Sequence, residues 1–184
     1  MSRITILLST LVFTGLLCSG CGTDVGSEEQ KPTPLDCQFT FALSGPTAVS
    51  NAESQRCSGR DWAPGSDMIF TTQVGEIPEY PGKSFELQLG VIVPEGDTPV
   101  EAVGFFALGN KEGDMSLRWL SDRAACAIAV DEMVPVMRGE EFTGRNVRLH
   151  GSCTRAALPM SGNPDPRDAY LNDIVLEAFV GGYR

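Results

Sequence analysis

The chain has 184 residues, with 14 Lys or Arg against 24 Asp or Glu, so its formal net charge is −10 and its pI is near 4.5. This acidic balance argues against general binding to nucleic acid or to anionic membrane surfaces, because both need basic patches. A hydrophobic fraction of 42% is typical of a globular protein, and the length accommodates one main domain.

The first 20 residues have the layout of a secretory signal. Arg3 supplies a short positive region, an uncharged apolar run extends from Ile4 to Leu17, and small residues follow. We expect residues 1–20 to form a signal helix that is cleaved from the mature protein. A permanent membrane helix is one alternative, since the uncharged span up to Thr23 has about the 20 residues that a bilayer requires. An ordinary signal without lipid attachment is the other.

The end of this segment resembles the lipobox of bacterial prolipoproteins. Ser19, Gly20 and Cys21 match the last three places of that motif, while Cys18 stands where Leu is usual. The resemblance implies cleavage after Gly20, transfer of diacylglycerol to the Cys21 thiol, and acylation of the new amino group by a fatty acid such as palmitate. Two or more acyl chains hold a protein stably on a membrane. Modification at Cys18 fits less well, because two large residues would then precede the cysteine.

Residues 21–35 are predicted to be the lipidated cysteine and a flexible tether. They contain two prolines and several charges but no apolar periodicity. In better-known lipoproteins an Asp directly after the lipidated cysteine retains the protein in the inner membrane. By that resemblance Gly22 favours the outer membrane, on its periplasmic or surface face. We expect residues 36–184 to form the folded domain.

Four further cysteines, Cys37, Cys57, Cys126 and Cys153, lie in the predicted domain. An even number in an exported domain indicates two disulfides, for which three connectivities are available. We favour the sequential pairs, because each then closes one strand-turn-strand unit and contributes about 3–4 kcal/mol on the chain-entropy model. A zinc site is disfavoured, since no two of the four have the CxxC spacing of a zinc knuckle.

The domain shows the period-two alternation of half-buried strands. Candidate strands are residues 37–43, 68–74, 84–93, 101–108, 116–120, 124–130, 146–153 and 174–180. Turn residues such as Gly109-Asn110 and Gly144-Arg145-Asn146 separate them. We therefore predict an all-β domain, an antiparallel β-sandwich of about 7–9 short strands. Residues 166–180 could be helix or strand, and we favour one helical turn at 166–171 before a final strand.

The stretch from Cys126 to the final strand, including FTGRNVRLHGSC, resembles small bacterial lipoproteins. In those proteins a tether follows the lipidated cysteine and leads into a disulfide-bonded β-domain. The resemblance implies the same organisation for this chain, and it carries no activity.

No GxSxG, P-loop, GxGxxG or HExxH motif occurs, and we expect no catalytic residues, metal or cofactor. His150 is the single histidine, and alternation places it on the solvent side of its strand with Arg148 and Asn146. Carboxylates and amides in residues 163–173 are oxygen ligands that suit Ca²⁺, but they lack EF-hand spacing. We therefore favour a solvated loop there.

Two aromatic residues, Trp62 and Tyr80, lie in loops rich in Gly and Pro. Exposed aromatic rings on β-domains can stack on sugars, so both are candidate ligand contacts. The alternative is that each covers an open end of the core while its polar atom reaches water.

These features predict a lipid-anchored protein of the bacterial cell envelope. Its domain is expected to be a non-enzymatic binding or structural module that does not bind nucleic acid and meets a protein or glycan partner in the envelope. A carbohydrate- or ligand-binding sandwich is the alternative, and a hydrolase that uses acidic residues ranks third.

Overall fold

The computed structural model describes residues 31–46, 49–50, 55–61, 67–76, 79–111 and 117–181. These residues belong to one compact unit that begins at Lys31. The predicted signal at 1–20, the lipidation site Cys21 and the first part of the tether lie outside the described residues. In the described ranges, no helix has the length and apolar character needed to cross a membrane.

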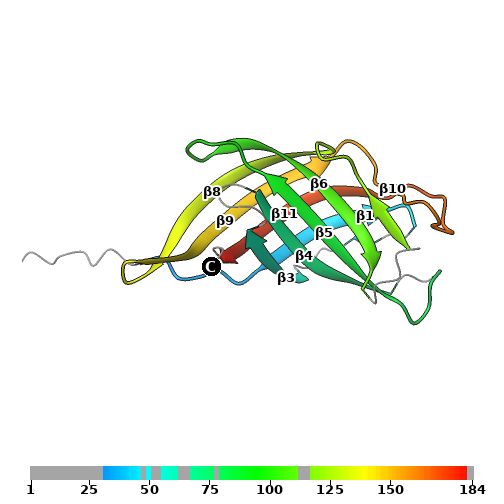
Figure 1. Cartoon of the computed structure of the whole chain (residues 1–184), viewed down its shortest axis with the longest axis horizontal. Helices are drawn as coiled ribbons and strands as arrows, with labels where there is room; N and C mark the ends of the chain where they lie inside the picture. The colour runs from blue at the N-terminus through cyan, green and yellow to red at the C-terminus, as the bar shows by residue number, and fades with distance from the viewer. Residues whose placement is uncertain are drawn as a thin grey trace, which may run out of the picture. The chain divides into compact units, whose positions relative to one another are not determined.

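The described part of the chain is all β-structure without a helix, as the alternation predicts (Figure 1). In chain order its strands are β1 (Gln38–Ser44), β2 (Val49–Ser50), β3 (Gln55–Asp61), β4 (Asp67–Glu76), β5 (Ser84–Ile92), β6 (Val100–Asn110), β7 (Arg118–Leu120), β8 (Cys126–Arg138), β9 (Glu141–Cys153), β10 (Leu158–Pro159) and β11 (Tyr170–Gly181). Strands β8 and β9 are longer than predicted and form one continuous hairpin.

The strands close into a barrel, so the predicted sandwich is wrong. Seven strands form the ring in the order β6, β5, β4, β3, β11, β9 and β8, and β8 pairs back with β6. Strand β1 lies between β3 and β11 over part of their length. The contact of β3 with β11, where Val180 faces Gly59, is the one parallel pairing among the described strands.

Strand β6 explains why one closed sheet forms in place of two layers. Its first half, Val100–Gly104, pairs with β8, whereas Ala107–Gly109 pairs with β7. Register shifts between Thr40 and Ala42 in β1, and between Val130 and Glu132 in β8, add bulges that bend their strands. Alternation is the same in a sandwich and in a barrel, so the sequence pattern did not separate these two folds.

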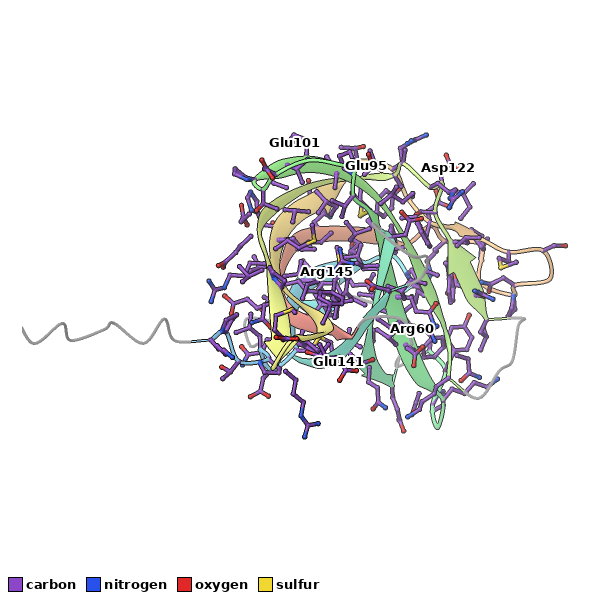
Figure 2. The ribbon with its side chains drawn as sticks, turned by 60° about the vertical axis from the view of Figure 1, so that its left-hand side comes forward. Arg60, Glu95, Glu101, Asp122, Glu141 and Arg145 are labelled. Carbon is purple, nitrogen blue, oxygen red and sulfur yellow. A yellow bond between two sulfur atoms is a disulfide. The ribbon has the colours of Figure 1, made fainter. Side chains whose placement is uncertain are left out.

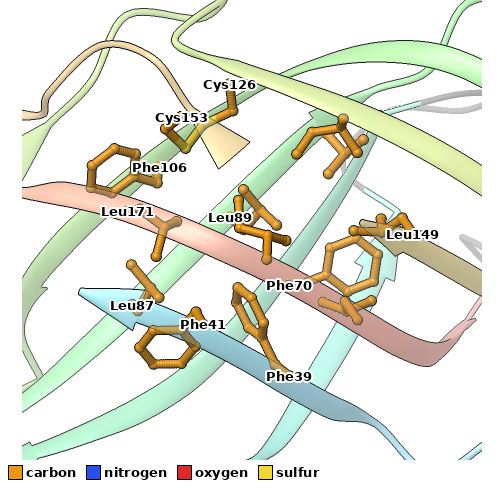
Figure 3. Close-up of a cluster of buried hydrophobic side chains, with 14 of the residues drawn as sticks. Phe39, Phe41, Phe70, Leu87, Leu89, Phe106, Cys126, Leu149, Cys153 and Leu171 are labelled. Atoms are coloured by element: carbon orange, nitrogen blue, oxygen red, sulfur yellow. A yellow bond between two sulfur atoms is a disulfide. The ribbon is translucent and has the colours of Figure 1, made fainter. Parts of the chain in front are cut away.

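The barrel interior is filled by the inward side chains of successive strands (Figure 3). Its largest fully buried members are Trp119, Phe39, Phe41, Phe70, Phe85, Phe106, Met68, Leu87, Leu89, Leu108 and Ile128. Burial of a side chain of this size contributes roughly 1.5–3 kcal/mol. The interior is therefore a packed core, and open ligand space lies elsewhere.

Both predicted disulfides are present. Cys126 and Cys153 face each other in register across β8 and β9, with Cα atoms 3.7 Å apart. The other disulfide links Cys37, which directly precedes β1, to Cys57 in β3, with Cα atoms 5.0 Å apart. Disulfides of this kind persist in oxidising compartments, so they indicate a location outside the cytoplasm.

The C-terminal segment settles the helix-or-strand ambiguity. The predicted final strand exists as β11, but the predicted helical turn at 166–171 is wrong. The Asp165 carboxylate accepts a hydrogen bond from the Arg167 backbone N–H at 3.0 Å. The Asp165 side chain thus closes a turn with the backbone two residues further on. This turn competes with a helical turn, so the segment after Asp165-Pro166 is irregular.

Candidate functional site

A groove of about 230 Å³ lies on the outer face of β5, β6 and β7. Its floor is formed by Ala107 and Gly109 of β6. Residues from the neighbouring strands and from the end of β6 line the rest: Glu86, Gln88, Asn110, Lys111 and Arg118. The groove thus lies outside the barrel, over the strands whose inner faces form the core.

The register of the three strands explains this groove. Gly109 faces Glu86 on β5 and Arg118 on β7, so the three residues form one row across the sheet. Since neighbouring strands lie about 4.8 Å apart, the two long side chains rise roughly 10 Å from each other with no side chain between them. A Cβ added at Gly109 would meet nothing closer than the Arg118 Cγ at 3.6 Å. The hollow therefore results from a small residue flanked by long ones.

The walls of the groove carry charges and amides. Glu86 accepts a 2.9 Å hydrogen bond from the Gln88 side chain on the β5 wall. Arg118 on β7 and Lys111 after β6 add two cations, and Asn110 adds an amide. Among the described lining residues, two cations stand against one anion. Such a lining suits a small polar ligand with an anionic group.

The Arg118 wall is held by the loop that follows β10. The Arg118 carbonyl oxygen accepts hydrogen bonds from the Met160 N–H at 2.9 Å and from the Asn163 side-chain amide at 3.0 Å. On the other side, the Asn110 N–H donates to the Leu117 carbonyl at 3.2 Å. The short strand β7 is therefore held by hydrogen bonds along both edges.

Tyr80 covers one end of the core. Its ring is half-buried and packs on Phe85, with ring centroids 6.0 Å apart. Its hydroxyl donates to Asp165 Oδ2 at 3.3 Å. Burial is the main reason that the pKa of the Tyr80 hydroxyl is raised, and the adjacent Asp165 charge raises this pKa further. Trp62 lies outside the described residues, so its part as a ligand contact remains a prediction.

Asp165 organises that end of the barrel. Its side chain is 3% exposed, and it accepts hydrogen bonds from the Arg167 guanidinium at 2.6 and 2.9 Å. These bonds are the main reason that the pKa of Asp165 is lowered. Arg167 also lies 3.4 Å from Glu79, and its carbonyl accepts from the Trp119 indole at 2.8 Å. The cluster is thus a structural cap, with its donors and acceptors used internally.

A second charged pair, Asp61 and Arg145, lies inside the barrel toward the other end. The Arg145 guanidinium lies 3.6 Å from Asp61, with side chains 15% and 6% exposed. Figure 2 shows Arg145 within the ring of strands. Burial raises the pKa of Asp61, and the Arg145 charge offsets part of that shift. Arg145 also donates to the Met133 sulfur at 3.5 Å.

His150 lies on the outer face, as predicted. Its Nδ1 is 2.8 Å from the Asp131 carboxylate, and both side chains are about half exposed, at 59% and 48%. Among the described residues, no group of three His, Cys, Asp or Glu could hold a metal ion. Asn146 shares the outer face but is covered, because residues of the predicted tether lie over it.

Comparison of the chain with protein-family models, curated proteins and solved structures returned no match.

Sequence reasoning did not find the groove. Gly109-Asn110 was interpreted as turn punctuation, but both residues belong to β6. The sequence does contain one signal for the groove. Ala107 and Gly109 are small residues at outward positions of a strand whose other outward residues are larger. Only the pairing of β6 with β5 and β7 shows that long side chains flank them.

Proposed function

We propose that this protein is a lipid-anchored, non-enzymatic binding module of the bacterial cell envelope, with the groove over β5–β7 as its binding site. The lipobox-like Ser19-Gly20-Cys21 supports anchoring, and the two disulfides agree with export. Gly22 favours the outer membrane. The groove, with cations and amides around a floor of small residues, is the observation that supports binding.

The ligand class follows from the lining. Arg118 and Lys111 would bind a carboxylate or another anionic group, while Gln88 and Asn110 would bind hydroxyls. The groove is shallow and holds no aromatic ring among its described lining residues, so hydrogen bonds and charge would dominate recognition. A small acidic sugar of the envelope combines both chemistries, in line with the ligand-binding alternative from the sequence.

The test is a titration of ¹⁵N-labelled protein with D-glucuronate, followed by amide NMR shifts, with D-glucose as the neutral counterpart. We expect saturable shifts at Ala107 and Gly109 with glucuronate and weaker ones with glucose. The variant Gly109→Leu should abolish them by filling the groove, and Arg118→Gln should weaken them.

Val103→Leu is the matched control, since Val103 is also outward on β6 but does not line the groove. It should bind as the wild type does. Equal shifts in Gly109→Leu and wild type would overturn the groove as the site. In a separate assay, release of nitrophenol from 4-nitrophenyl β-D-glucuronide by the protein would replace binding by hydrolysis.

A further inference from the structure

The β8–β9 hairpin extends beyond the rest of the sheet at one end of the barrel. Strand β8 pairs with β6 only over Cys126–Val130, whereas its pairing with β9 continues to Arg138. Strand β9 in turn pairs with β11 only from Gly144 onward. The last residues of β8, the turn at Gly139 and Glu140, and the first residues of β9 therefore form a projecting tip.

This tip, residues 137–142, presents an exposed apolar pair. Met137 and Phe142 face each other across the two strands and are 39% and 47% exposed. The charged residues around them, Arg138, Glu140 and Glu141, are also exposed. A tip that combines two large apolar side chains with charges of both signs suits the boundary between lipid headgroups and acyl chains.

The predicted tether joins the barrel beside the same hairpin. The Asn146 side chain donates to the Thr33 carbonyl at 2.7 Å and accepts from the Leu35 N–H at 2.9 Å. Asn146 lies on β9 only four residues from Phe142. In Figures 1 and 2 the described chain begins, in blue, next to the yellow tip of this hairpin.

The length of the tether limits how far this end can lie from a lipid anchor. Ten residue steps separate Cys21 from Lys31, and such a segment spans at most about 33–36 Å when fully extended. A protein anchored through Cys21 thus keeps Lys31, where the described chain begins, within about 36 Å of the bilayer surface.

We infer that the hairpin tip contacts the membrane that holds the lipid anchor, with Met137 and Phe142 entering the boundary below the headgroups. This inference rests on the proposed lipid anchor. The contact turns the barrel so that its long hairpin points to the bilayer. Another exposed apolar pair, Leu120 and Leu158, joins β7 to β10 at the far end of β6 and would point away from the membrane.

The test uses the full-length lipidated protein in vesicles of phosphatidylethanolamine and phosphatidylglycerol, with and without brominated acyl chains. A tryptophan is introduced by Phe142→Trp, with Leu158→Trp as the matched control, and the wild-type emission of Trp62 and Trp119 is subtracted. We expect the emission of the Phe142→Trp tryptophan to shift to the blue and to be quenched by the bromines. The Leu158→Trp tryptophan should show neither change.

Equal emission and quenching for the two variants, or quenching of Leu158→Trp alone, would overturn the inference. Met137→Trp provides a second probe of the same tip should Phe142→Trp not fold. Sedimentation of the wild-type protein with the vesicles reports the lipid anchor separately. Sedimentation without quenching at the tip would contradict the orientation alone, whereas loss of sedimentation would contradict the anchor.

Discussion

The Asn146 side-chain amide donates a 2.7 Å hydrogen bond to the carbonyl oxygen of Thr33, a residue 113 positions earlier in the chain. With the second bond, from the Leu35 N–H, this amide fixes the end of the predicted tether on β9. Asn146 is only 9% exposed as a result. The folded domain therefore begins before Cys37, and the tether has a defined point of attachment on the barrel.

Asn146→Ala should release this attachment. It removes both hydrogen bonds, so we expect the free energy of unfolding to fall by about 1–3 kcal/mol and the Leu35 amide to exchange its hydrogen much faster. Hydrogen exchange and urea denaturation measure the two effects. Asn172→Ala, on the exposed face of β11, should change neither. Unchanged exchange at Leu35 in Asn146→Ala would contradict the attachment.

Asp165 should make the protein sensitive to acid. Its pKa is lowered in the folded state, so its contribution to stability is present above the unfolded pKa near 3.8 and is lost as the pH falls through the folded pKa. Asp165→Asn should lower the melting temperature at pH 7, because it removes the charged partner of the Arg167 guanidinium. It should then lose less stability on acidification than the wild type.

The matched control for that comparison is Asp97→Asn, in an exposed turn. It should follow the wild-type melting curve at pH 7 and under acidification. The prediction is contradicted if the wild type and Asp165→Asn lose the same stability on acidification. The contact of Asp165 with Arg167 would then not stabilise the fold.

Gly144 should tolerate no side chain. A Cβ there would lie 2.2 Å from the Val180 carbonyl oxygen and 2.6 Å from the Phe179 ring, and the residue has a φ of 155°. We expect Gly144→Ala to cost about 1–3 kcal/mol, as overpacking does. Gly109→Ala, where space is available, should stay within about 0.5 kcal/mol of wild type. Similar unfolding midpoints for the two variants in urea would contradict this packing.

Much of the fold was predictable from local pattern. Alternation in QFTFAL and SFELQLGVIV identified β1 and β5, and the even number of cysteines indicated two disulfides. Those signals are local, because side-chain direction in a strand depends only on position.

The features that sequence reasoning missed depend on contacts between distant strands. Gly144 was predicted to lie in a turn, but it is a strand residue crowded by β11. Strand β3 contains Gln55, Arg56 and Ser58 and lacks the apolar content of a typical strand, so it was not predicted. Closure of the barrel, the groove beside Gly109 and the cover over Asn146 all require knowledge of which strands are neighbours.

Lipid attachment at Cys21 is the claim on which the account of this protein depends most. The most direct measurement is metabolic labelling with an alkyne-bearing palmitate in a bacterial host, followed by detection on the purified protein. Lipid attachment at Cys21 predicts labelling of the wild type and of Cys18→Ala, and complete loss of labelling in Cys21→Ala. Undiminished labelling of Cys21→Ala, or loss of labelling in Cys18→Ala, would contradict it.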